Sequence, residues 1–265
     1  MMNEELVLAV TGLAVGLASG MLGVGGCFIM VPVQYWLLLD RGLDSTLAIR
    51  SAFGTGLAVA LPTAASGAYA HRRRGAVDSR TGMALGGAGI AGALIGGYMA
   101  AHLPAEPLRL IFGFVVLVGA ARMALLPFCQ QGAYKEPSLV QLLAWGFPVG
   151  IVSGLSGIGG GVLLVPLMVI FLGFQIRRAV GTSSLAVTLT SMGGLVSYVI
   201  NGWGIQTISG SLGYVNLTHA AILALTSVPM AQIGTAYSHR LPEKQLRILF
   251  VAVMVYISLR MFFGR

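Results

Sequence analysis

The sequence carries very little charge. Only 9% of its 265 residues are charged, against roughly 25% in a typical soluble domain. A soluble protein of this size needs many charged residues on its surface, whereas 56% of this chain is hydrophobic. The composition therefore excludes a soluble enzyme and a disordered chain, and it predicts an all-α membrane protein with several spans. The formal net charge of +8 falls in short loops, so it indicates orientation in the membrane and no binding of nucleic acid.

Cysteines and acidic residues are scarce as well. The two cysteines, Cys27 and Cys129, lie in or beside apolar stretches and indicate neither a disulfide framework nor a metal site. No HExxH or GxSxG pattern occurs, and the eight acidic residues fall in loops or at the ends of apolar stretches. We therefore expect no intramembrane enzyme, no cofactor and no proton relay through a buried carboxylate. The N-terminus reads MMNEE, which lacks the basic region of a cleavable signal.

Long apolar stretches, by contrast, fill the chain. A spanning helix needs ~20 apolar residues. Proline, glycine and charged residues divide the sequence into eight such blocks: 6–39, 45–70, 82–103, 106–126, 138–174, 178–200, 217–238 and 243–263. The first and fifth blocks are too long for one crossing. Each holds a glycine cluster followed by a proline, which predicts a broken helix or a helical hairpin.

The chain also repeats itself. Residues 16–38 read GLASGMLGVGGCFIMVPVQYWLL, and residues 150–172 read GIVSGLSGIGGGVLLVPLMVIFL. Shorter matches follow in the same order through the rest of each half. The matches predict two transmembrane repeats, 1–129 and 130–265, each a glycine-rich broken or re-entrant helical block followed by three transmembrane helices.

Loop charges set the orientation of the two repeats. The loop at 71–80 carries four arginines and is predicted to be cytoplasmic, because basic loops stay inside. Its counterpart at 201–216 has no basic residue and is predicted to be external. The repeats are therefore expected to have inverted topology, with each glycine-rich block leaving and returning on one side. Arg260 and Arg265 weigh against this orientation, since it places them outside.

The glycine clusters are the first candidate site. Broken helices near the midplane of inverted repeats are a recurring plan for secondary transporters. A half-helix that starts after such a turn presents unpaired N–H groups and a positive dipole end, which bind small anions. Close packing of helices is the alternative role for these glycines. The candidate substrate-binding glycines are Gly23, Gly25, Gly26, Gly157, Gly159, Gly160 and Gly161.

Hydroxyls and arginines supply the other candidate groups. The segment AVGTSS follows the second glycine cluster, and SAFGTG is its counterpart in the first half. Their hydroxyls can donate to an oxyanion, or they can bond to their own helix or to a neighbour. An arginine just before each segment can attract an anion to a vestibule or mark the membrane boundary. The candidates are Thr55, Thr182, Ser183 and Ser184, with Arg50 and Arg178.

The duplicated motif resembles that of a known family. The segments GMLGVGGCFIMVP, GLSGIGGGVLLVP and RAVGTSSLAV, with a Gly-x-Val-Asp/Asn motif in each half, are similar to the sulfite exporter TauE/SafE family. The resemblance covers nearly the whole chain. It implies a multi-pass inner-membrane protein of bacteria or archaea that moves sulfite, organosulfonates or related sulfur-containing anions. The first half departs from the stronger pattern, because Phe53-Gly54-Thr55-Gly56 stands where the second half has more hydroxyls.

Residues and resemblance together predict a transporter that exports a small oxyanion, sulfite or an organosulfonate, by alternating access. A membrane potential that is negative inside favours exit of an anion by about 2.3 kcal/mol per charge per 100 mV, so export needs no coupling ion. Uptake or exchange by the same architecture is one alternative, and a non-transporting scaffold or sensor is another. The expected partners are the anion and the lipid bilayer, and homo-oligomerisation stays open.

Overall fold

The computed structural model describes residues 4–125, 137–205, 210–238 and 243–263, and these residues form an all-α protein. They contain ten helices and one short antiparallel hairpin. The helices are α1 Glu4–Leu22, α2 Cys27–Asp40, α3 Ser45–Arg72, α4 Ser79–His102, α5 Ala105–Leu125, α6 Leu139–Ser156, α7 Gly161–Ile170, α8 Ile176–Asn201, α9 Leu217–Ser238 and α10 Glu243–Phe263. The strands β1 Ser211–Leu212 and β2 Val215–Asn216 pair between α8 and α9. The predicted boundary between repeats, at 129–130, lies outside the described residues.

Seven of the described helices are long and apolar enough to cross a membrane: α1, α3, α4, α5, α6, α8 and α9. The shorter apolar helices are α2, α7 and the segment Val251–Phe263 of α10. Large apolar side chains such as Val140 and Leu225 are exposed on the outside of the bundle, which fits contact with lipid. The predicted helical, multi-pass class is thus confirmed.

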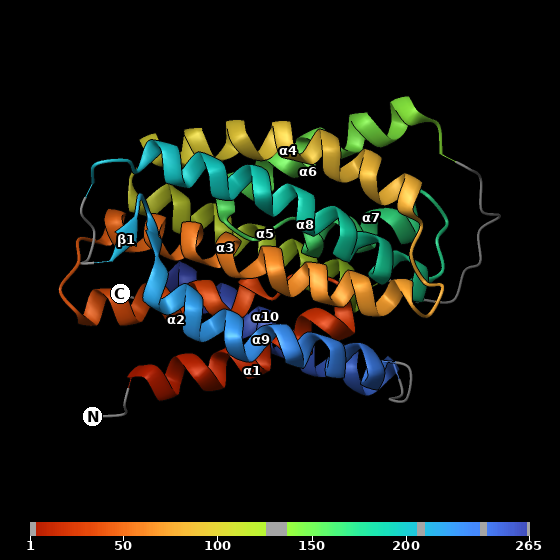
Figure 1. Cartoon of the computed structure of the whole chain (residues 1–265), viewed down its shortest axis with the longest axis horizontal. Coiled ribbons are helices and arrows are strands. Elements are labelled where there is room, and N and C mark those ends of the chain that lie inside the picture. Colours follow the sequence, from red (N-terminus) through yellow and green to blue (C-terminus); the bar gives the residue numbers. More distant parts are fainter. Residues whose placement is uncertain (1–3, 126–136, 206–209, 239–242, 264–265) are drawn as a thin grey trace.

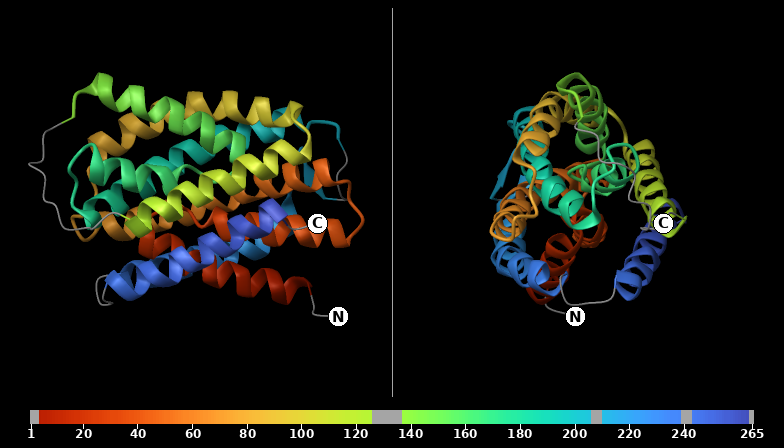
Figure 2. Two further views of the ribbon diagram at one scale, coloured as in Figure 1. Left: turned by 180° about the vertical axis from the view of Figure 1, so that it is seen from behind. Right: turned by 90° about the vertical axis from the view of Figure 1, so that its right-hand side faces the viewer.

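Helices from the two halves of the chain are interleaved in one bundle (Figure 1). α3 and α8 pack against each other, α4 lies along α6 and α8, and α9 lies along α1 and α3. In the end-on view α5 and α10 lie together on one side, and α1 lies beside α9 (Figure 2). α1 begins and α10 ends at the same end of the bundle, which we call the terminal end (Figure 1).

Both glycine-rich blocks are divided into two helices. The residues between α1 and α2 are 23–26, and those between α6 and α7 are 157–160, so each break falls at a glycine cluster. Arg41, just after α2, donates from Nε to Glu4 Oε2 over 2.8 Å, so the first block starts and finishes at the terminal end. The two legs are unequal, because α1 and α6 have 19 and 18 residues whereas α2 and α7 have 14 and 10. The sequence predicted two short half-helices, but only the second leg of each block is short.

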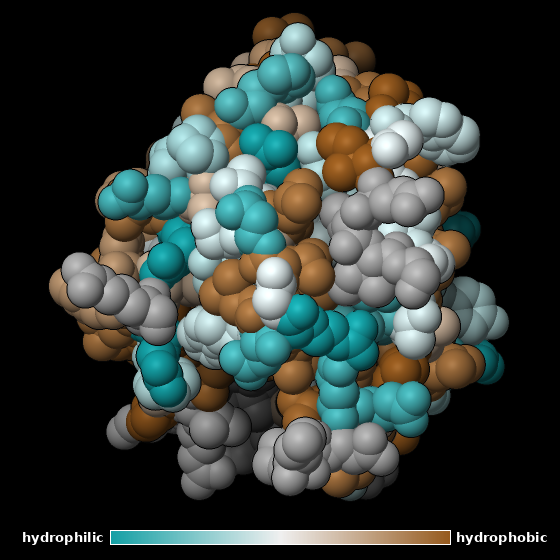
Figure 3. Space-filling model, turned by 90° about the vertical axis from the view of Figure 1, so that its left-hand side faces the viewer, coloured by the Kyte–Doolittle hydropathy of each residue, from teal (hydrophilic) through white to brown (hydrophobic). Residues whose placement is uncertain are grey.

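The terminal end is held together by polar contacts. Figure 3 looks onto this end and shows hydrophilic residues scattered among hydrophobic ones. Besides its bond from Arg41, Glu4 places Oε1 3.0 Å from Nε2 of the buried His219. The starts of α1 and α9 and the end of α2 therefore meet around one carboxylate.

Small residues let two helix pairs approach closely. Glycines recur every four residues along one face of α1 and of α6, the spacing that brings membrane helices into backbone contact. A Cβ built on Gly20 of α1 would lie 2.0 Å from the carbonyl oxygen of Ala231 in α9. A Cβ built on Gly154 of α6 would lie 2.3 Å from that of Ala93 in α4. The glycines of these two seams are Gly12, Gly16, Gly20, Gly146, Gly150 and Gly154.

We expect Gly154→Ala to destabilise the protein, because the added methyl group meets backbone that cannot rotate away. Overpacking of this kind costs about 1–3 kcal/mol. Gly87→Ala is the matched control, since Gly87 lies on α4 with no atom within 4 Å of the added Cβ. Melting temperatures of the purified variants should fall for Gly154→Ala and hold or rise for Gly87→Ala. Equal melting temperatures would show that the α6–α4 seam is looser than the structure indicates.

Candidate functional site

The two glycine turns share one unusual backbone conformation. Three glycines in the first glycine turn, residues 23–26, have φ between 67 and 75°. Three in the second glycine turn, residues 157–160, have φ between 64 and 81°. Glycine adopts this left-handed region without steric cost, whereas residues with a side chain rarely do. The residues concerned are Gly23, Gly25, Gly26, Gly157, Gly159 and Gly160.

The two turns lie against each other inside the bundle. A Cβ built on Gly161, the first residue of α7, would lie 2.4 Å from Cα of Val24 in the first turn. Both turns also lie close to the side chain of Val187 on α8. Val187 Cγ1 would be 3.0 Å from a Cβ built on Gly25 and 3.4 Å from a Cβ built on Gly159. The structure therefore brings the seven predicted glycines into one region, where backbone packs on backbone.

Short helices start from both turns. Gly26 and Gly160 are the N-cap residues of α2 and α7, and neither helix has a side-chain cap. At α7 the N–H groups of Leu163 and Leu164 bond back to the Gly160 carbonyl, at 3.1 and 3.0 Å. The N–H groups before them stand at the positive end of the α7 dipole, as at any helix start.

The hydroxyls of Thr55 and Thr182 join the two halves of the chain. Thr55 Oγ1 accepts a hydrogen bond from the N–H of Asn216, and Thr182 Oγ1 accepts one from the N–H of Asp78, each at 2.9 Å. Asp78 and Asn216 close the Gly-x-Val-Asp/Asn motif of each half. When the segments SAFGTG and AVGTSS are aligned without gaps, Thr55 corresponds to Ser183. The hydrogen bonds show instead that the structural counterpart of Thr55 is Thr182.

Ser183 and Ser184 are also hydrogen-bonded. Ser183 Oγ donates to the carbonyl of Gly23 at 2.9 Å, which fastens the first glycine turn to α8, and it also lies 2.9 Å from the Val180 carbonyl. Ser184 Oγ donates to the same Val180 carbonyl at 3.0 Å, the back-bond common for hydroxyls in helices. Ser183 therefore reaches a glycine turn, but it supports the backbone there.

Arg50 and Arg178 lie near opposite ends of α4 and bond to groups outside the glycine turns. Arg50 donates to the carbonyl of Leu103, just after α4, at 2.9 Å and to Tyr214 Oη at 3.2 Å. Arg178 pairs with Asp78, the N-cap of α4, at 3.2 Å. The 24 residues of α4 separate these two partners by about 36 Å at 1.5 Å per residue. The structure therefore keeps the two arginines far apart from each other.

Two serines outside the predicted set lie beside the second glycine turn. Ser191 Oγ on α8 would be 3.1 Å from a Cβ on Gly159, and Ser153 Oγ on α6 would be 3.6 Å from one on Gly160. Both side chains are fully buried, and neither oxygen has a hydrogen-bond partner among the residues that the structure describes. The two hydroxyls thus face the turn with their hydrogen-bonding capacity unused.

The first glycine turn has no counterpart of Ser191. Ser191 lies nine residues after Thr182, and the residue nine after Thr55 is Ala64. The side chains nearest to Gly25 are those of Val187 and Ala60, both apolar. The free hydroxyl of Ser191 is therefore specific to the second turn, whereas Ser153 has a buried counterpart in Ser19.

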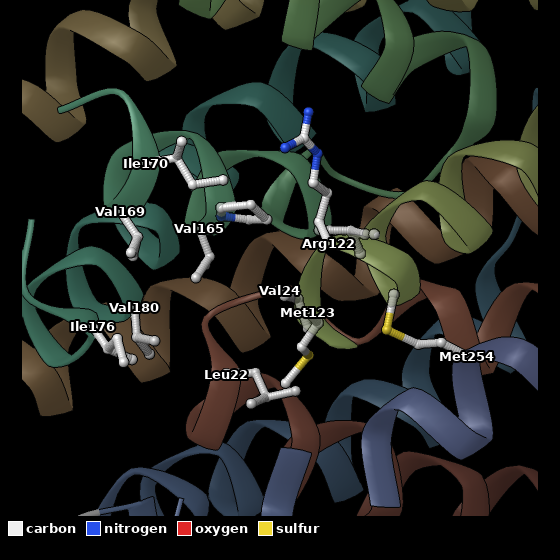
Figure 4. A pocket seen from close by; sticks show the side chains of 13 residues that line it. Leu22, Val24, Arg122, Met123, Val165, Val169, Ile170, Ile176, Val180 and Met254 are labelled. Carbon is white, nitrogen blue, oxygen red and sulfur yellow. The ribbon is translucent and has the colours of Figure 1, made fainter. Parts of the chain in front are cut away.

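A cavity of about 80 Å³ lies beside the contact between the two turns. Figure 4 shows side chains of α7 on one side of it, those of Arg122, Met123 and Met254 on the other, and Val24 between them. Arg122 is the one charged or polar residue of this lining; the others are Leu22, Val24, Gly119, Met123, Val162, Val165, Pro166, Val169, Ile170, Ile176, Val180 and Met254.

The fold and the paired discontinuous helices define a multi-pass helical membrane protein, and comparison with known proteins places it further. The chain belongs to the sulfite exporter TauE/SafE family, whose model matches residues 8–261. It is 26% identical over 258 residues to a probable membrane transporter protein of Haemophilus influenzae, covering 97% of each chain. Over 256 residues it is 24% identical to one of Methanocaldococcus jannaschii, covering 96% of this chain and 94% of the relative.

A third relative is the probable membrane transporter protein YunE of Bacillus subtilis, 26% identical over 277 residues with 97% of each chain covered. No solved structure matches. The resemblance expected from the duplicated motif is confirmed, and the protein is a membrane transporter by family and not an enzyme.

We expect Thr55→Val and Thr182→Val each to lower the melting temperature, because each leaves a backbone N–H without its acceptor. An unsatisfied buried donor costs about 1–3 kcal/mol. Thr55→Val should cost more, since its bond is buried and that of Thr182 only partly so.

Thr190→Val is the control for both variants, because the Thr190 hydroxyl only donates to the Ala186 carbonyl of its own helix. Thermal unfolding and sulfite binding should be measured together. If Thr182→Val keeps its normal melting temperature but loses sulfite binding, the Thr182 hydroxyl belongs to the ligand site after all.

Proposed function

We propose that the protein transports small oxyanions and exports a sulfur-containing one, sulfite or an organosulfonate. The observation that carries the proposal is the pair of buried hydroxyls, Ser153 and Ser191, without partners in the described part of the chain and next to the second glycine turn. Buried polar groups are nearly always hydrogen-bonded, so a free pair at one spot indicates a missing acceptor. A small oxyanion supplies several acceptor atoms at once.

Neutral donors suit a ligand that must also leave. The proposed site comprises Ser153 and Ser191, the turn at 157–160 and the start of α7 at Gly161. Backbone N–H groups at a helix N-terminus bind anions through their dipoles, with no buried cation to hold the anion permanently. Gly159 lets a ligand approach the backbone beside Ser191, since a Cβ there would lie 3.1 Å from Ser191 Oγ.

Inverted repeats and alternating access complete the proposal. Three features support a two-fold relation between the halves: the seams of α1 on α9 and of α6 on α4, the matched bonds of Thr55 and Thr182, and the breaks at both glycine turns. Under this relation the short legs α2 and α7 re-enter the membrane, and rocking of the halves exposes the site to each side in turn.

Export is the direction that the charges favour. The described acidic residues lie at helix ends or in loops, and none of them is a fully buried residue placed to couple proton movement along the bundle. A negative interior alone then drives an anion outward. Sulfite flux from proteoliposomes under an imposed potential, with and without a pH gradient, separates export from uptake or exchange, and a scaffold or sensor would show no flux.

Removal of one free hydroxyl should weaken ligand binding without unfolding the protein. We expect Ser191→Ala and Ser153→Ala each to lower sulfite affinity by roughly 10- to 150-fold, the equivalent of one hydrogen bond to a charged group. Their melting temperatures without ligand should hold, because no bond within the described protein is lost.

Ser197→Ala is the control on the same helix, since its hydroxyl donates to the Leu94 carbonyl of α4. Calorimetric titration with sulfite in oxygen-free buffer measures all three variants. Unchanged affinity in both Ser191→Ala and Ser153→Ala would remove the second glycine turn from the site.

Accessibility of single cysteines tests the inverted topology. In a background with Cys27 and Cys129 replaced, Arg74→Cys should stay unlabelled by an impermeant thiol reagent in intact cells. Leu212→Cys, in the β-hairpin, should be labelled; the tip of this loop, 206–209, lies outside the described residues. Both positions are exposed, so burial does not confuse the comparison. Labelling of Arg74→Cys without labelling of Leu212→Cys would reverse the orientation.

A further inference from the structure

The end of the bundle opposite the terminal end is basic. Three consecutive arginines finish α3 and follow it, and their side chains are exposed. No ion pair joins any of them to a side chain that the structure describes. Their charges are therefore not neutralised within the described protein. The residues are Arg72, Arg73 and Arg74.

Two of these arginines line a cleft between α3 and α9. The two helices run side by side toward this end of the bundle (Figure 1). The cleft has a volume of about 320 Å³, which is within the range of small-molecule pockets. Arg72 does not line it. The lining residues are Tyr69, Ala70, Arg73 and Arg74 from the end of α3 and Gln232 from α9.

Polar contacts fix the walls of this cleft. Ser66 Oγ on α3 donates to the Val228 carbonyl of α9 at 2.9 Å, and it accepts from Gln232 Nε2 at 3.2 Å. The Arg73 guanidinium lies 5.9 Å from the ring centroid of Tyr69, which is a cation–π contact. The cleft is therefore already formed, and one of its guanidinium groups is held against an aromatic ring.

The cleft lies at the depth of the membrane–water boundary. α3 has 28 residues and is about 42 Å long at 1.5 Å per residue, which exceeds the ~30 Å hydrocarbon core of a bilayer. With the middle of α3 at the midplane, Tyr69 lies about 16 Å from it, at the edge of the core. The Tyr69 ring is exposed, as is typical of the tyrosines at this boundary. Arg73 and Arg74 then lie among the lipid headgroups.

An apolar face of α9 leads from the cleft toward the middle of the membrane. Leu225 lies seven residues before Gln232, so the two share one face of the helix, and the Leu225 side chain is 77% exposed. Pro229, between them on the same face, is exposed as well. An acyl chain can lie along this face while its headgroup occupies the cleft. A soluble phosphate would make no use of the apolar face.

We propose that this cleft binds the headgroup of an anionic phospholipid such as phosphatidylglycerol. The lipid phosphate accepts hydrogen bonds from the guanidinium groups of Arg73 and Arg74, whose planar forks match phosphate oxygens. Basic pockets between membrane helices bind lipid headgroups in this way. Because α3 and α9 belong to different halves of the chain, the bound lipid bridges the two halves. The site takes a component of the membrane and no transported anion, so it is independent of the proposed function.

Calorimetric titration of the full chain in detergent tests this proposal. The ligands are dioctanoyl-phosphatidylglycerol, dioctanoyl-phosphatidylcholine, which has the chains without net charge, and glycerol 3-phosphate, which has the charge without chains. We expect the phosphatidylglycerol to bind at least tenfold more tightly than either of the others. Arg73→Gln and Arg74→Gln should each weaken its binding roughly tenfold or more, the equivalent of one hydrogen bond to a charged group. Arg72→Gln is the matched control and should leave the affinity unchanged, because Arg72 does not line the cleft.

Ala70→Phe tests the cleft without a change of charge, because its ring fills the space between α3 and α9 and should weaken binding of the phosphatidylglycerol as much as Arg73→Gln does. Melting temperatures without lipid should stay at the wild-type value in the arginine variants, since these side chains are exposed. Three results would overturn the proposal. Equal losses in Arg72→Gln and Arg73→Gln would show attraction by surface charge alone. Equal affinity for the phosphatidylcholine would show unselective lipid contact, and equal affinity for glycerol 3-phosphate would show a site for soluble phosphate.

Discussion

A polypeptide that interrupts a helix inside a bilayer must satisfy its backbone hydrogen bonds without water. The two glycine turns interrupt helices inside the bundle, and the protein packs them against each other and against α3 and α8. Ser183 donates to the Gly23 carbonyl at 2.9 Å, and the Cys27 sulfhydryl donates to the Gly56 carbonyl at 3.5 Å. The residues of both turns are buried.

The halves meet this demand in related but unequal ways. The bonds from Asn216 to Thr55 and from Asp78 to Thr182 correspond in length and in position. One of the two free hydroxyls has no counterpart, because Ala64 stands where the second half has Ser191. Ser191 on α8 is therefore a free donor with no equivalent at the matching position of α3.

Sequence reasoning located the apolar helices and the two breaks, because hydropathy and glycine clusters are local signals. It also identified the family, since the duplicated motif is local too. It did not find the partners of Thr55 and Thr182, because each bond joins residues more than 100 positions apart. Ser153 stands within the repeated segment, yet only the fold shows that its hydroxyl faces Gly160. Ser191 lies seven residues after Ser184, two helical turns, and this spacing was the available signal for a shared face.

The seams of α1 on α9 and of α6 on α4 have a mechanical consequence. Interlocked side chains resist sliding, because ridges on one helix must climb out of the grooves of the other. At Gly20 and Gly154 the nearest atoms of the neighbouring helix are backbone atoms, so no side chain interlocks there. At these two positions the contact offers little steric resistance to shear along the helix axis while it still opposes separation. The glycines that hold each long helix against its neighbour thus also favour small axial displacements of one helix along the other.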